Sequence, residues 1–342
     1  MRSHNLSIFE RLTLEEVEIT LDLHTSEQAP VDRYTEFSWS VSRHAMFSRC
    51  KRQYYLSYYG ARRVREANNP VVSAIWWLKQ ATPARTYIGS VIHEAASAAV
   101  KALQRGAEMS RAEIAALAVE TYRAGVLASR RAARHDGQWV VLFEHIYPGD
   151  GFSIDPDEAE GLVANLAERL YESEAYQALR GVDPRTIREV DPPFQSFELP
   201  GVPELGSVRV FAIPDVLLHD APLGAVRIVD WKTGSVVHEG IRSQAGVYKL
   251  YACSQYGVPQ DAVEFVLADL GGGGASVQPP GEPISVEGAE AFARESIYNM
   301  VSAMENIRSN TVRIRDFPMT DDRSLCRWCG FRRACWRHEA DG

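Results

Sequence analysis

The sequence predicts a mixed fold of the α/β (α+β) class whose core carries a helical insertion. Three observations support this class. The 342 residues are 45% hydrophobic and 24% charged, which is typical of globular proteins. Helical periodicity dominates up to about Gly181, and stretches rich in Val, Ile and Phe alternate with helical patterns after it. At roughly 150 residues per domain, the length predicts about two domains or one large elaborated domain.

The N-terminal part is predicted to be an arm followed by helices. Residues 1–36 are polar and are expected to form an N-terminal arm or edge element. Ser40 or Ser42 is suited to cap a helix that runs through the aromatic and basic segment behind it. Another helix is expected at about 89–103. Residues 37–104 are therefore assigned to an N-terminal helical part of the main domain.

Two further helices are predicted in the next segment. Ser110 and Glu113 have the spacing of a capping box, which indicates a helix that begins there. Asp155 followed by Pro156 indicates the start of the next helix, because proline is favoured at the first helical position. This segment holds no motif that points to chemistry, so residues 105–180 are predicted to be a helical insertion.

The remainder of the chain is predicted to alternate strands and helices. A meander of three strands is expected at 186–199, 207–219 and 225–231. A helix at about 241–256, a strand at 262–270 and a long helix at 286–308 are expected after it. We assign residues 181–310 to the core of the fold and residues 311–342 to a cysteine-rich C-terminal segment.

The most informative residues are two aspartates at the ends of apolar strands. A carboxylate buried there is costly unless a cation or a donor compensates it. The strands that end at Asp215 and carry Asp230 are consecutive, so a hairpin could bring both carboxylates to one hard cation. Lys232 points to the same side as Asp230, where it can orient water or stabilise charge on a phosphate. Taken alone, Asp-x-Lys is more simply an ion pair at a hairpin end.

Three other polar side chains are candidates for the same site. Gln244 and Tyr248 are four residues apart, so they share a helical face and could contact a phosphate or a base. An exposed glutamine beside a half-buried tyrosine is the common alternative. His93 lies near the start of an apolar helix and is a candidate third metal ligand. A single histidine of this kind is more often a satisfied core residue.

Together these residues resemble a known family. Their order is His93, Pro214-Asp215, Asp230-x-Lys232 and Gln244-x-x-x-Tyr248. This order resembles the PD-(D/E)XK nuclease superfamily, and in particular its RecB-like branch. The segment 37–55 also resembles the N-terminal signature of that branch. The matching elements are scattered from about residue 37 to residue 336, so the resemblance spans nearly the whole chain.

The resemblance implies a fold and an activity. The fold is restriction-endonuclease-like, a central mixed sheet flanked by helices, and the activity is metal-dependent hydrolysis of phosphodiester bonds in DNA. The implied metal ligands for Mg²⁺ or Mn²⁺ are His93, Asp215 and Asp230, and the implied catalytic residues are Asp215, Asp230 and Lys232. The residues implied to hold the substrate are Gln244 and Tyr248. For an additional acidic residue on the preceding strand, Glu189 and Glu198 both remain candidates.

Four of the five cysteines form a second pattern. Three follow the spacing Cys-x2-Cys-x5-Cys, and the four residues are Cys50, Cys326, Cys329 and Cys335. Four thiolates can hold either tetrahedral zinc or an iron–sulfur cluster. This spacing resembles the iron–sulfur staple of four-cysteine RecB-like nucleases, including AddB-type and CRISPR-associated members. A [4Fe–4S] cluster is favoured, zinc is the alternative occupant, and unrelated surface thiols are the simplest alternative.

The predicted cysteine site is surrounded by basic and aromatic side chains. The basic residues are Arg43, Arg49, Lys51, Arg52, Arg323, Arg327, Arg332, Arg333 and Arg337, and the aromatic ones are Tyr54, Tyr55, Trp328, Phe331 and Trp336. Guanidinium groups and rings together suit single-stranded nucleic acid. The net charge of −8 argues against coating of nucleic acid through bulk charge. A solvated charged face is the simpler interpretation.

These observations favour a Mg²⁺- or Mn²⁺-dependent deoxyribonuclease, most simply an exonuclease on single-stranded DNA or duplex ends. Its expected role is DNA repair, recombination or defence, including CRISPR spacer processing. The alternative is a catalytically silent iron–sulfur module that binds DNA or assembles within a larger nuclease–helicase or CRISPR adaptation complex. No phosphate-binding loop of a helicase is present, so unwinding would need a partner. A cytoplasmic location is expected, since no membrane span or secretory signal is apparent.

Overall fold

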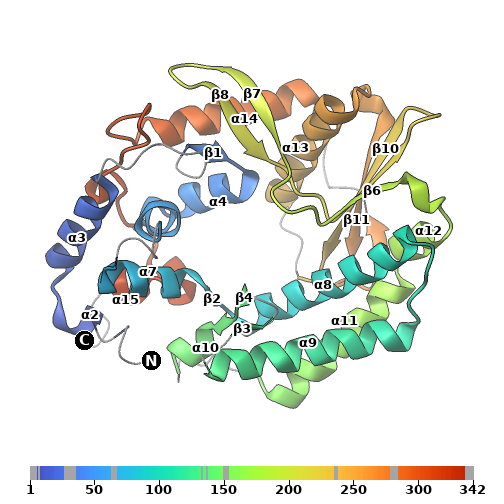
Figure 1. Ribbon diagram of the computed structural model, residues 1–342, viewed down its shortest axis with the longest axis horizontal. Helices are drawn as coiled ribbons and strands as arrows, with labels where there is room; N and C mark the ends of the chain where they lie inside the picture. The colour runs from blue at the N-terminus through green and yellow to red at the C-terminus, as the bar shows by residue number, and fades with distance from the viewer. Residues whose placement is uncertain are drawn as a thin grey trace.

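The computed structural model describes residues 6, 8–26, 36–62, 68–131, 134–135, 138–148, 154–234, 238–277 and 284–335. Within these ranges, helices surround two mixed sheets, which confirms the predicted mixed α/β class (Figure 1). None of the helices in the described ranges is both long and apolar enough to cross a membrane.

The helices occupy both halves of the chain. In chain order they are α2 (Ile8–Arg11), α3 (Leu14–Ser26), α4 (Val41–Arg49), α5 (Lys51–Tyr55), α7 (Pro70–Lys79), α8 (Ala84–Gln104), α9 (Arg111–Arg131), α10 (Phe143–Ile146), α11 (Pro156–Glu172), α12 (Glu174–Arg180), α13 (His238–Tyr256), α14 (Val286–Val301) and α15 (Arg332–Cys335). A π-helical turn, Leu56–Gly60, continues α5.

The strands form two main sheets. In chain order they are β1 (Ser38–Trp39), β2 (Ala81–Thr82), β3 (Arg134–His135), β4 (Gln138–Trp139), β5 (Val141–Leu142), β6 (Ile187–Val190), β7 (Ser196–Val202), β8 (Gly206–Phe211), β9 (Val216–Asp220), β10 (Ala225–Lys232), β11 (Val263–Asp269) and β12 (Ala275–Val277). The five-stranded sheet has the order β12-β11-β10-β9-β6, and the three-stranded sheet has the order β1-β8-β7. In the larger sheet β10 pairs with β11 in parallel and with β9 antiparallel, so this sheet is mixed.

Helices cover both faces of the five-stranded sheet. Along β10, Val229 and Trp231 belong to the apolar cluster formed with α8, α9, α11 and α12. The alternate residues Val226 and Ile228 belong to the other cluster, which includes α13 and α14. Since side chains alternate along a strand, Asp230 shares its face with Ile228 and lies on the α13 side. Figure 1 shows the sheet between these two groups of helices.

The predicted three-strand meander is wrong in its detail, because two of its strands are each divided. The stretch 186–199 splits into β6 and β7 at Asp191, whose φ of 44° and following Pro-Pro end the first strand. The stretch 207–219 splits into β8 and β9 around Pro214. As a result β7 and β8 leave the large sheet and pair with β1.

Some helix predictions are confirmed and others are corrected. The Ser40 hydroxyl accepts from the backbone of Arg43, so it caps α4, and Asp155 caps α11 in the same way. The predicted helix through Cys50 is instead broken there, because Cys50 has extended backbone angles (φ −160°, ψ 110°). The last long helix ends at Val301 rather than near residue 308.

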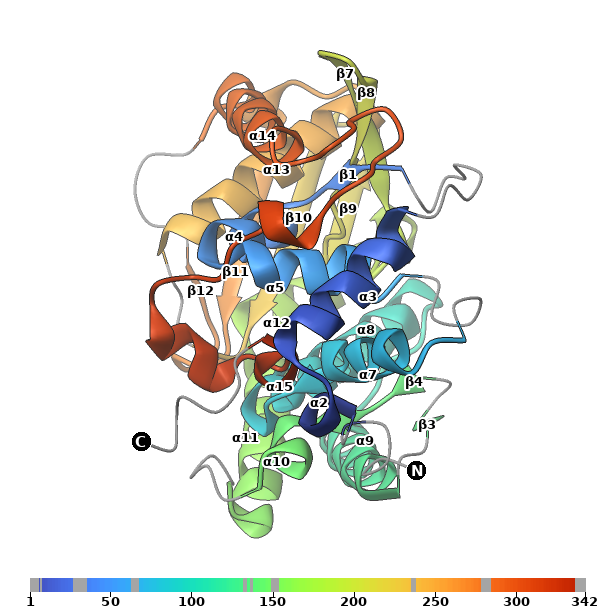
Figure 2. The same ribbon diagram turned by 90° about the vertical axis from the view of Figure 1, so that its left-hand side faces the viewer.

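The predicted N-terminal arm contains a helix that packs into the core. Helix α3 begins with a reciprocal cap between Thr13 and Glu16 and buries Val17 and Leu21. It contacts α7, which the sequence pattern did not reveal, and also α15 near the other end of the chain. Figure 2 shows α3 across this side of the molecule, above α2 and beside α7.

Candidate functional site

The antiparallel pairing of β9 and β10 brings the two predicted aspartates together. Val216 pairs with Val229, so Asp215 precedes the first paired residue of β9 while Asp230 follows its partner on β10. The hairpin expected from the sequence is therefore present. Asp230 is 2% exposed, whereas Asp215 is partly exposed.

Asp215 is held by two donors from different elements. Its Oδ2 accepts a hydrogen bond from the backbone N–H of Trp231 at 2.8 Å, which ties it to β10. Its Oδ1 lies 3.1 Å from Nδ1 of His93 on α8. A third contact links the neighbouring strand, since the backbone N–H of Asp191 donates to the Asp215 carbonyl at 2.9 Å. The structure thus joins His93 to the carboxylate site.

Helix α8 can bring His93 to this site because it approaches the end of β10 closely. Gly89 faces Thr233, the residue that follows β10. A Cβ atom on Gly89 would lie 2.9 Å from the Thr233 hydroxyl oxygen. That distance is too short for a side chain, so glycine permits the approach of the helix. His93 lies one helical turn further along α8 and is positioned by the same contact.

Asp230 belongs to a chain of polar contacts with Lys232 and α13. The Lys232 ammonium lies 2.6 Å from Oδ2 of Asp230 and donates to Oε1 of Gln244 at 3.1 Å. The Gln244 amide in turn donates to Oδ1 of Asp230 at 3.2 Å and to the Tyr248 hydroxyl at 3.0 Å. Tyr248 donates to the Ile213 carbonyl at 2.6 Å. All four predicted residues therefore lie in one network.

Burial makes the charge of Asp230 costly. The pKa of Asp230 is raised to about 6, mainly by desolvation and then by the nearby Asp215, against the opposing effect of Lys232. Among the described residues, Oδ2 of Asp230 is one of the few buried side-chain oxygens that accept no hydrogen bond. The Lys232 ammonium lies 2.6 Å from this oxygen as its ion-pair partner. The oxygen therefore has capacity for a further positive ligand.

His93 and Tyr248 are also titratable, and the pKa of each is raised, for different reasons. Burial lowers the pKa of His93, but the charge and hydrogen bond of Asp215 outweigh it, and the net pKa is raised. Burial and the carboxylates Asp230 and Asp215 raise the pKa of Tyr248 well above its ordinary value. Tyr248 is thus a neutral hydrogen-bond donor, and His93 has a proton that a metal would displace.

The donor set fits a hard divalent cation, although no complete metal site is preformed. Two carboxylates and an imidazole, one carboxylate having an oxygen without a hydrogen bond, suit Mg²⁺ or Mn²⁺. Within the described ranges, however, no three His, Cys, Asp or Glu side chains are gathered closely enough to hold a metal ion. Binding would therefore require His93, Asp215 and Asp230 to adjust.

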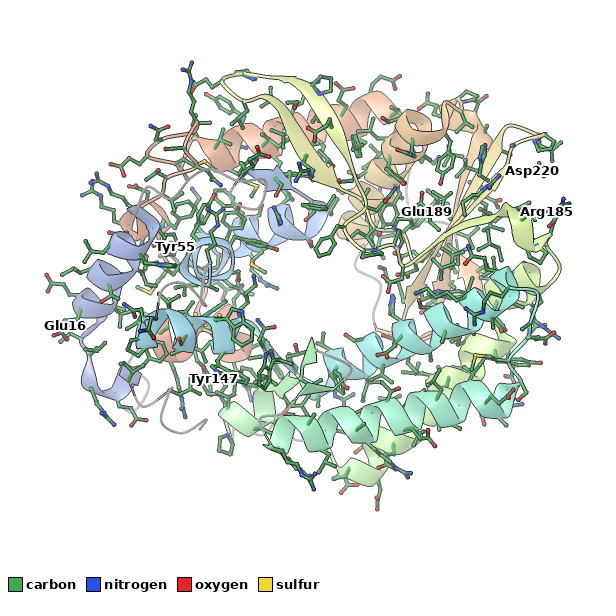
Figure 3. The ribbon with its side chains drawn as sticks, viewed as in Figure 1. Glu16, Tyr55, Tyr147, Arg185, Glu189 and Asp220 are labelled. Carbon is green, nitrogen blue, oxygen red and sulfur yellow. The ribbon has the colours of Figure 1, made fainter. Side chains whose placement is uncertain are left out.

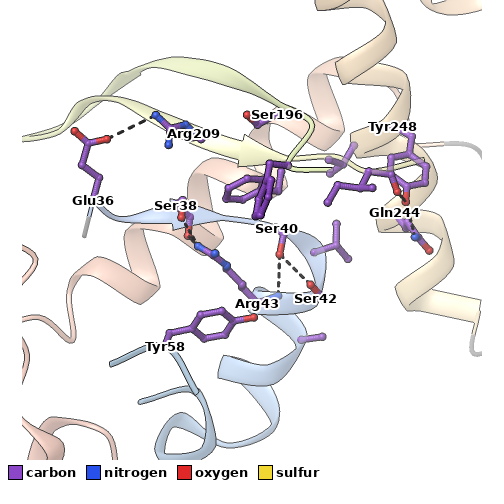
Figure 4. A pocket seen from close by; sticks show the side chains of 16 residues that line it. Glu36, Ser38, Ser40, Ser42, Arg43, Tyr58, Ser196, Arg209, Gln244 and Tyr248 are labelled. Carbon is purple, nitrogen blue, oxygen red and sulfur yellow. Dashed lines mark hydrogen bonds and ion pairs between the residues drawn. The ribbon is translucent and has the colours of Figure 1, made fainter. Parts of the chain in front are cut away.

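Pockets lie on both sides of the two aspartates. One, of about 970 Å³, is lined by His93, Asp191 and Thr233. The other, of about 910 Å³, is lined by Gln244 and Tyr248 and continues towards α4 (Figure 4). The network thus lies between two spaces that can admit a substrate.

The structure also places the candidates for an additional acidic residue. Glu189 accepts hydrogen bonds from Tyr251 and Tyr256 where β6 meets α13 (Figure 3). Glu198 lies on β7 in the other sheet, beside Arg209. Neither contacts the network described above, whereas Asp191 does, through the Asp215 backbone. Its only signal in the sequence is an acidic residue at a strand end before two prolines.

The four predicted cluster cysteines lie in one region. The pKa of Cys335 is raised to about 12, mainly by burial, with Arg52 opposing the shift and the thiols of Cys329, Cys50 and Cys326 contributing to it. The four thiols are thus within electrostatic reach of one another. They do not form a ready metal site among the described residues, so the structure by itself does not support the expected iron–sulfur cluster.

Most of the predicted aromatic surface near the cysteines is part of the core. Tyr54, Tyr55 and Phe331 are buried, as is Arg52, which donates to the Phe317 carbonyl. The expectation that these rings stack nucleic-acid bases is therefore wrong, because Tyr54 and Tyr55 pack against Phe317 and Phe331 is buried in the same core. Trp328 is 50% exposed. Trp336 and Arg337 lie outside the described residues.

Comparison with known families gives one match. The family model described as the PD-(D/E)XK nuclease superfamily matches residues 38–336. This range includes both aspartates, Lys232, His93 and the C-terminal cysteines. No curated protein matches the chain at a significant level.

Proposed function

This chain belongs to the PD-(D/E)XK nuclease superfamily, and we propose on that basis that it is a metal-dependent DNA nuclease of the RecB-like type. Members of the superfamily are typically metal-dependent nucleases. The observation that carries the proposal is the convergence of two contact groups, His93 with Asp215 and Asp230 with Lys232 and Gln244. The hydrogen bond from the Trp231 backbone N–H to Asp215 brings the two groups together. We further propose that the enzyme is an exonuclease on single-stranded DNA or duplex ends.

The proposed metal ligands are His93, Asp215 and Asp230. A bound Mg²⁺ or Mn²⁺ would supply an activated water and neutralise charge on the scissile phosphate. The Trp231 backbone N–H keeps Asp215 oriented, and Oδ2 of Asp230 has room for a cation. The raised pKa of Asp230 supports the same assignment, since a nearby cation favours the ionised carboxylate.

Lys232 is proposed to act on the phosphate. Its side chain is about one-quarter exposed, and its ammonium lies beside Asp230, where it can donate to a phosphate oxygen as negative charge develops. Gln244 accepts from Lys232 while donating to Asp230, so one amide orients both groups. Tyr248 supports that amide and is anchored on the Ile213 carbonyl. We propose that Gln244 and Tyr248 also contact the substrate.

The cysteines are proposed to hold a [4Fe–4S] cluster, with zinc as the alternative occupant. Soft thiolates suit either metal, and the four thiols share one region. Buried thiols whose pKa values are raised, such as Cys329 at about 11, ionise at neutral pH only when a cation holds them. Iron and sulfide analysis of protein purified without oxygen tests this. Colourless protein with stoichiometric zinc would instead establish the alternative.

The activity is tested with end-labelled and circular DNA in Mg²⁺, Mn²⁺ or chelator. We expect linear single strands to be shortened from their ends with either cation and to survive in chelator. Cleavage of circular single strands, which have no ends, would show that the enzyme is an endonuclease rather than an exonuclease. DNA binding without cleavage of any substrate would favour the silent module of a larger nuclease–helicase or CRISPR adaptation complex.

A further inference from the structure

The pocket lined by Gln244 and Tyr248 extends well beyond the proposed catalytic residues. Its walls come from α4, β7, β8 and α13, and its volume is about 910 Å³. Figure 4 shows Gln244 and Tyr248 at one end and Arg43 with Tyr58 at the other. The proposed catalysis uses only the first end. The far end therefore needs its own explanation.

Arg43 is held in a fixed orientation at the far end. Its Nη1 donates to the Ser38 carbonyl at 2.7 Å, and its guanidinium lies 4.6 Å from the Tyr58 ring and 5.2 Å from the Phe211 ring. No carboxylate pairs with Arg43 among the residues that the structure describes. A planar cation fixed on two rings and not neutralised by an acid is suited to bind a phosphate.

Lys79 adds a second cation beside the same ring. Its ammonium lies 5.4 Å from the Tyr58 ring, on the side chain that Arg43 also contacts. Crowding by protein atoms lowers the pKa of Lys79, although its surface remains exposed, and the charges of Arg43 and Arg62 lower it further. No carboxylate pairs with Lys79 within the described ranges. Lys79 is not among the residues that line the pocket, but its charge adds to that of Arg43 and makes this end of the pocket more attractive to an anion.

Phe194 gives the pocket an exposed aromatic face. It lines the same pocket, its side chain is 81% exposed, and its backbone φ is 62°. A non-glycine residue rarely adopts this left-handed conformation, and such strain concentrates at functional sites. An exposed ring in the same pocket as a guanidinium, here that of Arg43, is the feature that unpaired bases stack on.

We propose that this pocket binds single-stranded DNA on its way to the catalytic residues, with a backbone phosphate held by Arg43 near the charge of Lys79 and a base stacked on Phe194. An unpaired strand is required, because bases within a duplex are already stacked and cannot lie on the ring. The destination of the strand rests on the proposed nuclease function. Binding of single-stranded DNA to the pocket does not depend on that function, so the binding proposal and the nuclease proposal can fail separately.

The test measures DNA binding without cleavage. A fluorescent thymidine oligonucleotide of about twenty nucleotides is titrated in chelator, and its anisotropy is followed at several salt concentrations. Arg43→Ala should weaken binding about tenfold and make the salt dependence shallower by about one phosphate contact, and Lys79→Ala should weaken binding by about threefold. Phe194→Ala should weaken binding about tenfold with an unchanged salt dependence, since stacking releases no counterion.

Arg185→Ala is the matched control. Arg185 is exposed and lies at the outer edge of the molecule (Figure 3), so removing its charge should leave binding unchanged. Because Lys79 is exposed, Lys79→Ala should fold normally even if Arg43→Ala does not. Thermal melting checks that each variant is folded. If the Arg43 and Lys79 variants bind like Arg185→Ala, the proposal is overturned, even when the wild type cuts DNA.

A small substrate separates this proposal from the nuclease function. The p-nitrophenyl ester of thymidine 5′-phosphate has one phosphodiester and no strand to occupy the far end of the pocket. Its cleavage in Mn²⁺ should be the same for wild type and Arg43→Ala, while long single strands are cut more slowly by the variant. Specific binding without cleavage of either substrate would refute only the nuclease function.

Discussion

Asp230 is the residue on which the candidate site depends most. It is nearly inaccessible, yet its neighbours include another carboxylate, Asp215, as well as the cation Lys232. A protein gains nothing in stability from such a charge, since burial of the ionised form is unfavourable. Its presence is therefore better explained by chemistry than by folding, which leads to two tests at this scale.

Replacement of Asp230 by Asn should stabilise the metal-free protein. The pKa of about 6 exceeds the value of roughly 4 in an unfolded chain. The folded state therefore binds the extra proton between these values, and its stability falls as pH rises from about 4 to about 6. At pH 7 in chelator we expect the free energy of unfolding of Asp230→Asn to exceed that of wild type by up to about 3 kcal/mol, as measured by urea denaturation.

The matched control for that measurement is Asp220→Asn. Asp220 lies at the other end of β9, is partly exposed and caps the backbone of Leu223, which an asparagine can also do. The free energy of unfolding of Asp220→Asn should be close to that of wild type. A metal-free Asp230→Asn protein that is less stable than wild type at pH 7 would contradict the stated cost of the buried charge.

Metal binding should depend on pH through His93. Because Asp215 raises the pKa of His93, the proton persists to higher pH than on an ordinary histidine. The metal competes with this proton, so affinity for Mn²⁺ should increase with pH until the histidine is neutral. Calorimetry across this pH range should show a weaker dependence in His93→Gln. An identical dependence in the variant would remove His93 from the ligand set.

Among the elements, α8 is the one that joins the site to the helical layer. It carries His93, and its Gly89 permits contact with Thr233 after β10. In the same helical layer, α9 and α11 pack on α8 to complete the apolar cluster behind the sheet. A shift of α8 would therefore move the histidine away from Asp215 without unfolding the sheet.

Gly89→Ala tests this positioning. The added Cβ would meet the Thr233 hydroxyl at 2.9 Å and push α8 outward, so we expect a loss of nuclease activity that exceeds the loss of stability. Gly161→Ala in α11 is the control, because no atom lies within 4 Å of its Cβ position. That variant should be more stable by about 0.5–1 kcal/mol and fully active. Unchanged activity of Gly89→Ala would refute the positioning role.

Local signals explain which elements were predictable. Ser110 and Asp155 mark the first residues of helices, because their side chains form hydrogen bonds with residues two or three positions away. Such helix starts can therefore be predicted from the sequence. The hairpin of Asp215 and Asp230 was predictable for the same reason, since its connection is short. The division of the strand at Asp191 does have a local signal in the two prolines that follow it. The pairing of β7 and β8 with β1, by contrast, joins segments far apart in the sequence, which no local pattern contains.

At the scale of the whole molecule, the two ends of the chain share one core. Buried Arg52 donates to the Phe317 carbonyl at 2.8 Å and pairs with Glu18, and its backbone N–H donates to Pro318 at 3.1 Å. One side chain thus links α3, α5 and the C-terminal segment. The sequence suggested a basic surface here, because a buried arginine and an exposed one look alike until their partners are known.

Arg52→Met should destabilise the protein by about 3 kcal/mol, because it leaves Glu18 and the Phe317 carbonyl without their donor. Urea denaturation measures the change. Lys51→Met, at the exposed neighbouring position, should remain within about 0.5 kcal/mol of wild type. A similar small effect of both substitutions would show that the two ends of the chain are held together by other contacts.

The measurement that tests the central claim most directly is the rate at which wild type and Asp230→Asn cut a labelled single-stranded DNA in Mn²⁺. We expect rapid cleavage by wild type, none in chelator, and a rate on the order of 100-fold lower in the variant with unchanged DNA binding. Equal rates for the two proteins would contradict the assignment of Asp230, and so would DNA that remains intact with the wild type.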